Sequence, residues 1–283
     1  QLPSVGAGNV FSDLIRSGRI ATVALRDIFR QAGQSMIVRN AHLVNTGMPP
    51  QLKNAAANDF FFLPRRDSVR LVETVVELCK TRLPDKMGIP AEELQVLTPT
   101  RRGDAGTRSL NFALQAALNP PAPGKKERRF GELTFREGDR VMQTRNDYDV
   151  IWQKEDGTAG TGIFNGDVGK IARIDPSGEL LEIVFDDRTA VYTADMLAEL
   201  DMAYAMTVHK AQGSEYRGVV FVGAPCAPSL MVRGVLYTAI TRARELLVIV
   251  GDDSAVNKMA ENDRRSRRYS GLKWRLRKGG EEK

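Results

Sequence analysis

Segment 203–216 gathers the kinds of side chain that bind phosphate and ribose. It supplies, in order, a hydroxyl, an imidazole, an ammonium, an amide, a glycine and a carboxylate, from Thr207, His209, Lys210, Gln212, Gly213 and Glu215. Packing alone does not demand that mixture. The segment is therefore a candidate loop for binding nucleotide or nucleic acid.

A second candidate is segment 236–244, whose pattern predicts the end of a helix followed by a buried strand. Arg242 and Arg244 lie at this junction. An arginine there can reach across a cleft between domains and stabilise the charge that develops on a phosphoryl group during its transfer.

The elements that must position these residues follow an α/β pattern. From Val23 onward, apolar runs alternate with helical patterns, as in parallel strands joined by crossover helices. Strands are expected at 60–63, 94–97, 218–222 and 246–250, the last two of the kind buried on both faces. Helices are expected from Asp67 or Ser68, from Thr107 and over 229–242. The first of these has an expected apolar face of Val69, Val72, Val75, Val76, Cys79 and Leu83.

Segment 130–200 has a different pattern. It contains period-two runs and the turn pairs Asn165-Gly166 and Ser177-Gly178, without a convincing helix. We expect a small all-β module inserted in the α/β domain and entered through the proline-rich hinge 119–124. The chain opens abruptly with a loop at 1–8 and a short helix at 10–15, and we therefore expect it to be a fragment.

The amino-acid composition limits the kinds of partner that the chain can have. The chain of 283 residues is 42% hydrophobic, enough for at least one full core, and its formal charge of +6 favours a polyanionic partner. Basic residues gather at 125–129 and at 264–278, the second cluster being expected as a solvated tail. Cys79 and Cys226 are expected to be reduced thiols, and no metal site is expected. No apolar run approaches the roughly 20 residues that cross a bilayer, so we expect a cytoplasmic protein without a membrane partner.

Motif by motif, the sequence resembles the RecD-like DNA helicases of superfamily one. The stretch TVHKAQGSE at 207–215 resembles the family's motif V, and YTAITRAR at 237–244 its motif VI. IFRQA at 28–32 is similar to motif IV, and QLPSVGAG at 1–8 to the end of motif III. The resemblance continues through GDRVMQ at 138–143, FNGDVG at 164–169 and RYSGL at 268–272. These last three are closer to the free-standing RecD-like enzymes than to the RecD subunit of exonuclease V.

The resemblance implies a RecA-like parallel sheet of the P-loop NTPase type, with helices on both faces, and a small barrel like a Src-homology-three domain. Residues 1–20 would be the tail of a first RecA-like domain. Residues 21–129 and 201–283 would form the second RecA-like domain, and 130–200 the inserted barrel.

The resemblance also implies roles for single residues. The nucleotide contacts would be Gln1, Arg30, Arg242, Gly213 and Glu215, the two arginines reaching the γ-phosphate. Thr207 and His209 would touch the phosphates of single-stranded DNA. An exposed arginine at a helix start and an ordinary surface carboxylate are the alternative interpretations of Arg30 and Glu215.

The resemblance implies further contacts to single-stranded DNA in two places. The loop 98–103 follows a parallel strand, where open α/β sheets bind ligands, which makes Thr98, Arg101 and Arg102 candidates. Solvated loop charges are the alternative. In the barrel, Arg145, Asn146, Tyr148 and Trp152 combine cationic, polar and stacking groups suited to single-stranded nucleic acid, although the aromatic rings suit a barrel core equally well.

Two motifs of the family are absent from the sequence. The chain has no GxxxxGK(S/T) loop and no acidic Mg²⁺-binding motif of the family. By resemblance, a first RecA-like domain would hold most of the ATP and Mg²⁺, so residues 1–283 alone should not hydrolyse ATP. The complete enzyme is expected to be an ATP-dependent helicase that moves 5′ to 3′ on single-stranded DNA and opens junctions with duplex. The alternatives are a single-stranded DNA-binding module without catalysis, and an RNA or relaxase-linked helicase domain.

Overall fold

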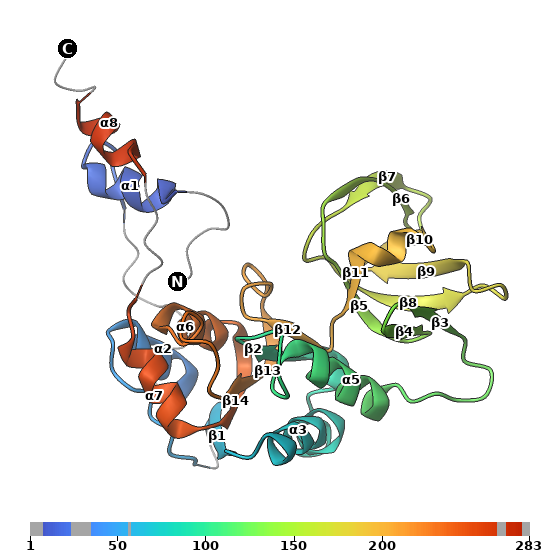
Figure 1. Cartoon of the computed structure of the whole chain (residues 1–283), viewed down its shortest axis with the longest axis horizontal. Helices are drawn as coiled ribbons and strands as arrows, with labels where there is room; N and C mark the ends of the chain where they lie inside the picture. The colour runs from blue at the N-terminus through green and yellow to red at the C-terminus, as the bar shows by residue number, and fades with distance from the viewer. Residues whose placement is uncertain (1–7, 24–34, 56–57, 265–269, 279–283) are drawn as a thin grey trace.

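A five-stranded parallel sheet forms the centre of the larger part of the molecule (Figure 1). The computed structural model describes residues 8–23, 35–55, 58–264 and 270–278, so that Gln1 and Arg30 lie outside the described residues. Every pair of neighbouring strands in this sheet is parallel. In sheet order the strands are β1 (Phe60–Pro64), β14 (Ala243–Gly251), β13 (Tyr216–Gly223), β2 (Leu94–Thr98) and β12 (Ala205–Thr207).

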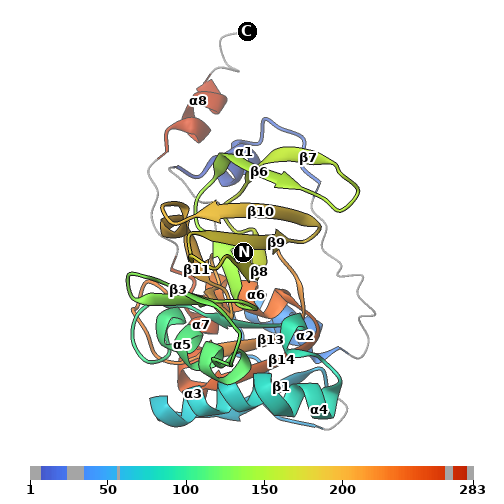
Figure 2. The same cartoon turned by 90° about the vertical axis from the view of Figure 1, so that its right-hand side faces the viewer.

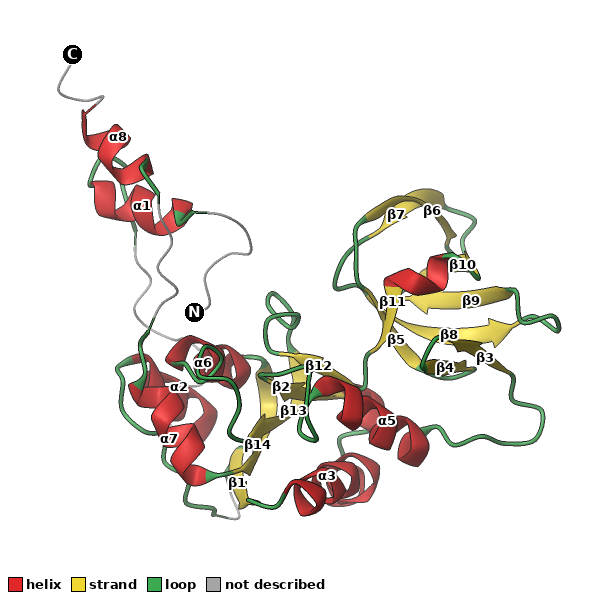
Figure 3. Cartoon of the chain, viewed as in Figure 1, coloured by secondary structure: helices red, strands yellow, loops and turns green. Residues whose placement is uncertain are grey.

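Helices cover both faces of this sheet, as expected for strands that are apolar on both sides (Figure 3). One face carries α2 (Met36–Asn45), α6 (Arg233–Thr241) and α7 (Asp253–Glu261). The other carries α3 (Ser68–Glu77), continued through a π-helical turn (Leu78–Arg82) into α4 (Leu83–Met87), and α5 (Thr107–Leu118). A 3₁₀ turn at Ala91–Glu93 precedes β2. The fold is therefore the α/β class that the sequence predicts.

Side-chain caps explain where several helices begin. The side chain of Asp67 accepts a hydrogen bond from the Arg70 backbone N–H at the start of α3, as predicted. The apolar face of α3 differs from the prediction in one detail. Leu71 and Val75 are buried, whereas Val69 is 63% exposed, because the helix turns the 71 and 75 positions toward the sheet. Helix α6 begins at Arg233, later than the expected 229, since the residues before it form turns.

The second part of the molecule is an antiparallel β module. Its main sheet has seven strands in the order β11, β5, β8, β9, β10, β6 and β7, and a separate hairpin joins β3 to β4. Figure 2 shows β8, β9 and β10 facing the viewer. The core of the module includes Phe135, Phe185 and Tyr192, all 0% exposed. The strands are β3 (Glu127–Phe130), β4 (Leu133–Arg136), β5 (Arg140–Gln143), β6 (Asp147–Gln153), β7 (Ala159–Ile163), β8 (Val168–Ile174), β9 (Leu180–Phe185), β10 (Arg188–Thr193) and β11 (Leu200–Met202), with a 3₁₀ turn at Met196–Glu199.

Two terminal helices pack against each other. Helix α1 (Val10–Ser17) lies beside α8 (Leu272–Lys278), and the Arg277 guanidinium donates to the backbone carbonyls of Arg16 at 3.0 Å and Ser17 at 3.5 Å. Arg277 thereby satisfies carbonyls at the end of α1. Helix α8, close to the C-terminus, thus packs on α1, close to the N-terminus. None of the helices in the described parts of the chain is long and apolar enough to cross a membrane.

Candidate functional site

The candidate residues lie at opposite edges of the parallel sheet. Thr207 ends β12 and is paired in register with Thr98, which ends β2, so both stand at the carboxyl edge. Tyr216 begins β13 opposite Ala243, so Glu215 and Arg242 directly precede the amino edge. Loop 208–215 connects the two edges, and we call it the crossing loop.

Arg242 is tied directly to the crossing loop. Its half-buried guanidinium donates from Nη1 to the Ser214 carbonyl at 2.7 Å and from Nε to the Thr238 carbonyl at 3.2 Å. The Arg242 carbonyl in turn accepts from the Tyr216 backbone N–H at 2.9 Å. The arginine lies here because it is the single residue between the end of α6 at Thr241 and the start of β14 at Ala243. A movement of this side chain would therefore break its hydrogen bond to Ser214 or displace the crossing loop.

The nucleotide candidates in the crossing loop are backbone and carboxylate groups. Gly213 adopts a φ of +91°, a conformation that side chains other than glycine rarely take. An added Cβ there would meet no atom within 4 Å, so the backbone is open to a close approach. Glu215 immediately precedes β13 and lies beside Ser214, which accepts from Arg242. Among the residues described, no group of three or more histidine, cysteine, aspartate or glutamate side chains could hold a metal ion.

Where the crossing loop begins, at the carboxyl edge of the sheet, a tight turn presents His209 and Lys210. The backbone N–H groups of Lys210 and Ala211 both donate to the Thr207 carbonyl, at 3.0 and 3.2 Å. His209 is exposed, yet the side of its ring that faces the protein is desolvated enough to lower its pKa. Burial, followed by the nearby Arg101 charge, also lowers the pKa of Lys210. Both side chains of this turn are thus partly desolvated, which disfavours their charged forms.

The neighbouring loop between β2 and α5 presents two arginines. Arg101 is 75% exposed and pairs with Asp201 at 3.6 Å, and Arg102 is exposed. Thr98 differs from its expected role as a strand contact: it is 0% exposed, and its hydroxyl donates to the Ala105 carbonyl at 2.8 Å. Its side chain shapes the loop from inside, because the end of a central strand is covered by the loop that follows. Gly106 closes the same loop.

The barrel contributes its rim to this edge. The Lys210 ammonium donates to the Asn165 side-chain oxygen, and the Asn165 backbone N–H donates to Asn146 Oδ1 at 3.0 Å. Arg145 lies 3.7 Å from Glu199 and is largely exposed. Arg101, Arg145, Asn146, His209 and Lys210 thus belong to one region where two loops of the sheet meet the barrel.

Two aromatic candidates in the barrel have different surroundings. Tyr148 is 66% exposed and lies edge-on to Phe164, with ring centroids 5.5 Å apart. Trp152 is half-buried across Gly160, where an added Cβ would approach the indole ring to 2.4 Å. Tyr148 is the aromatic group free to stack on a base, whereas Trp152 is occupied in packing.

Sequence reasoning missed Asn165, Phe164 and Asp201 as members of this region. Asn165 was recognised in a turn pair with Gly166 and, with Phe164, in the stretch FNGDVG at 164–169, but neither pattern shows which turn of the barrel faces the sheet. Asp201 gave no signal because its partner, Arg101, is distant in the chain.

Comparison with known proteins bears on both parts of the chain. Residues 110–185 match the family model described as the ATP-dependent RecD-like DNA helicase SH3 domain, and residues 202–250 match that of the UvrD-like helicase C-terminal domain. The ATP-dependent RecD2 DNA helicase of Deinococcus radiodurans is 34% identical over 267 residues, 94% of this chain and 33% of that protein. The chain belongs to the RecD-like helicases of superfamily one.

Other RecD-like proteins match over similar lengths. The RecBCD enzyme subunit RecD of Mycolicibacterium smegmatis is 29% identical over 99% of this chain and 48% of its own length. The chain therefore spans about a third to a half of these RecD-like relatives. Among solved structures, Bacteroides Pif1 bound to ssDNA covers 92% of this chain and 57% of its own, with 16% identity and a TM-score of 0.47.

Proposed function

We propose that this chain forms the second motor domain and the inserted barrel of an ATP-dependent DNA helicase. The proposed helicase translocates 5′ to 3′ on single-stranded DNA and unwinds duplex at junctions. The direction of movement and the junction substrate rest on the family resemblance. A first RecA-like domain would provide the phosphate loop and most of the Mg²⁺ and ATP contacts, and Gln1, Arg30, Arg242, Gly213 and Glu215 would complete the nucleotide site.

The observation that carries the proposal is the course of the crossing loop. It begins beside Thr98 at the carboxyl edge and ends beside Arg242 at the amino edge. A nucleotide that draws Arg242 toward its γ-phosphate would weaken the bond from Arg242 to Ser214 and displace the loop that bears Thr207 and His209. Such a connection is what a motor needs in order to couple ATP hydrolysis to its grip on a strand.

Substitution of Arg242 tests the nucleotide half of this proposal in the complete enzyme. Arg242→Ala removes a guanidinium that would stabilise the transferring phosphoryl group, so kcat for DNA-stimulated ATP hydrolysis should fall on the order of 10³-fold. Arg30→Ala should act in the same way. Arg244→Ala is the matched control, because Arg244 lies in the same motif and is exposed. Wild-type turnover by both Arg242→Ala and Arg30→Ala would refute the assigned roles.

A single-stranded DNA-binding module without catalysis is the second candidate function. For such a module, the region of Arg101, Arg145, Asn146, His209 and Lys210, which we call the strand-facing region because it would face the DNA strand, would be enough. The bond between Arg242 and the crossing loop has no purpose in such a module, and this favours the motor.

A further inference from the structure

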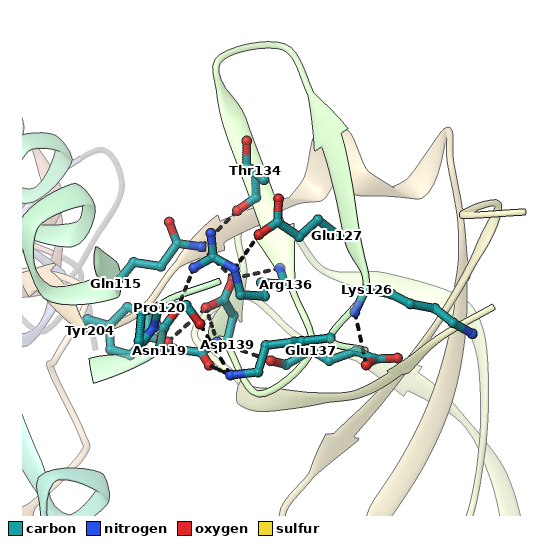
Figure 4. A network of polar contacts seen from close by, with 11 residues as sticks. Gln115, Asn119, Pro120, Lys126, Glu127, Thr134, Arg136, Glu137, Asp139 and Tyr204 are labelled. Carbon is teal, nitrogen blue, oxygen red and sulfur yellow. Dashed lines mark hydrogen bonds and ion pairs between the residues drawn. The ribbon is translucent and has the colours of Figure 1, made fainter. Parts of the chain in front are cut away.

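Asp139, immediately before β5, has a fully buried carboxylate that is surrounded by hydrogen-bond donors (Figure 4). Its Oδ1 accepts from Asn119 Nδ2 at 2.7 Å and from the Tyr204 hydroxyl at 2.8 Å. Its Oδ2 accepts from Gln115 Nε2 at 2.6 Å and from the Arg136 backbone N–H at 2.7 Å. The ion pairs found among the described residues do not include Asp139. We call Asp139 and the three side chains that donate to it the hinge hub.

The hinge hub joins both places where the chain passes between sheet and barrel. Gln115 and Asn119 lie in the last turn and at the C-cap of α5, where the chain leaves for the barrel. Tyr204 lies between β11 and β12, where the chain returns. Asp139 itself belongs to the barrel side. One carboxylate therefore holds the outgoing and the returning connection together.

A second contact from the next residue reinforces the same joint. The half-buried Arg140 guanidinium donates to the Leu94 carbonyl and to Gln95 Oε1, both at 2.9 Å. Gln95 Nε2 donates in turn to the carbonyls of Ala203 and Tyr204, at 3.3 and 3.2 Å. Strand β5 of the barrel is thus bonded to β2 of the sheet and to the returning connection.

The orientation of the donors requires a carboxylate at position 139. Gln115 Nε2 also donates to the Thr134 carbonyl, and Asn119 Nδ2 to the Glu137 carbonyl, so each amide has its nitrogen fixed toward the hub. The Arg136 backbone N–H can only donate. An asparagine at position 139 would therefore place its own N–H₂ group against at least one donor.

Burial raises the pKa of Asp139, while its four hydrogen bonds oppose that shift, so the charged form is held here against a desolvation cost. In some proteins a buried polar group of this kind fixes one conformation. Asn165, on the rim of the barrel, contacts Lys210 of the crossing loop. A barrel held in one position would keep this contact in place.

We propose that Asp139 is a positioning residue that sets the barrel against the sheet and so holds its rim, at Asn146 and Asn165, beside Lys210 where the strand binds. The inference rests on the proposed single-strand binding. Asp139 would contribute to binding although it contacts neither the single-stranded DNA nor the nucleotide.

The test compares Asp139→Asn with Asp186→Asn in the 283-residue chain. Asp186 is an exposed turn residue with a φ of 52°, which asparagine also adopts, so it undergoes the same chemical change away from the hub. Two readouts are needed: hydrogen exchange of segments 119–126 and 200–206 without DNA, and the affinity for a labelled oligo(dT). Asp139→Asn should accelerate exchange in both segments and weaken binding by about 5- to 10-fold, as loss of one buried hydrogen bond allows. Asp186→Asn should change neither.

A milder variant keeps the test decisive if Asp139→Asn fails to fold. Tyr204→Phe removes only the hydroxyl that donates to the hub and should weaken binding in the same direction by a smaller factor. Binding measured per folded molecule that stays unchanged in both variants, or exchange that stays unchanged in the hinge, would overturn the positioning role. If the wild-type chain did not bind the oligonucleotide at all, the proposed function would be overturned instead. The exchange data would still test whether the hinge hub holds the two connecting segments.

Discussion

At the scale of single residues, the environment of a side chain decides which of the predicted contacts can act. Thr98 ends a parallel strand, where open α/β sheets bind ligands, yet its hydroxyl donates to the Ala105 carbonyl. His209 and Lys210 are exposed or half-buried, and the pKa of each is lowered. His209 therefore gains its positive charge at a lower pH than an ordinary histidine does.

His209 should make strand binding sensitive to pH. Because its pKa lies below the ordinary value, the free protein carries a neutral imidazole at pH 7.5 and gains the positive charge only below about pH 6.5. Lowering the pH to 5.5 should strengthen oligonucleotide binding by about two- to five-fold, as an exposed ion pair allows. Fluorescence anisotropy checks this, with His209→Gln expected to lose the increase.

His42→Gln is the control for that titration. His42 lies on α2 and is the only other histidine in the chain, so its replacement should leave the increase intact. An equal increase in the His209→Gln variant would place the strand elsewhere.

At the scale of elements, the loop between β2 and α5 depends on one glycine. An added Cβ at Gly106 would lie 2.6 Å from the Arg102 carbonyl oxygen, which is backbone and cannot rotate away. The loop closes tightly because Gly106 N–H donates to the Gly103 carbonyl and Thr107 N–H to the Thr100 carbonyl. The positions of Arg101 and Arg102 therefore follow from the absence of a side chain at 106.

Gly106→Ala should displace both arginines. We expect the free energy of unfolding to fall by about 1–3 kcal/mol and oligonucleotide affinity to fall with it. Urea unfolding and anisotropy measure the two effects. Gly103→Asn is the control, because Gly103 has a φ of +81° with open space around it, and asparagine tolerates that conformation. A Gly106→Ala variant as stable as wild type would show that the loop is not constrained in this way.

The elements were largely predictable from the sequence, and their contacts were not. Continuous apolar runs identified β1, β2, β13 and β14, because strands buried on both faces are apolar throughout. A turn-rich pattern of period two identified the barrel, because strands buried on one face alternate apolar and polar residues. The contact between Asn165 and Lys210, and the hub at Asp139, join residues far apart in the chain. No local sequence pattern predicts such pairs. The motifs therefore indicated single candidate residues but not the contacts between them.

At the scale of the whole molecule, we propose that the chain contributes a surface for single-stranded DNA and arginines for the nucleotide, and its sequence contains no GxxxxGK(S/T) phosphate loop. Purified 1–283 should therefore show no DNA-stimulated ATP hydrolysis above background, and addition of a first RecA-like domain that carries GxxxxGK(S/T) should restore it. A coupled ATPase assay checks both statements. Turnover that co-purifies with 1–283 through repeated chromatography would contradict them.

The central claim is that the crossing loop and the barrel rim together bind single-stranded DNA through its phosphates. Its most direct test is the salt dependence of oligonucleotide anisotropy for residues 1–283. If three or four phosphates are neutralised, log K should fall against log salt with a slope of roughly −2 to −3, and equally for different base sequences. Removal of residues 264–283 should preserve most of the affinity, whereas the double substitution of Arg101 and His209 by alanine should remove much of it. Affinity that disappears with the tail, or that survives the double substitution unchanged, would show that the strand does not bind where the crossing loop meets the barrel.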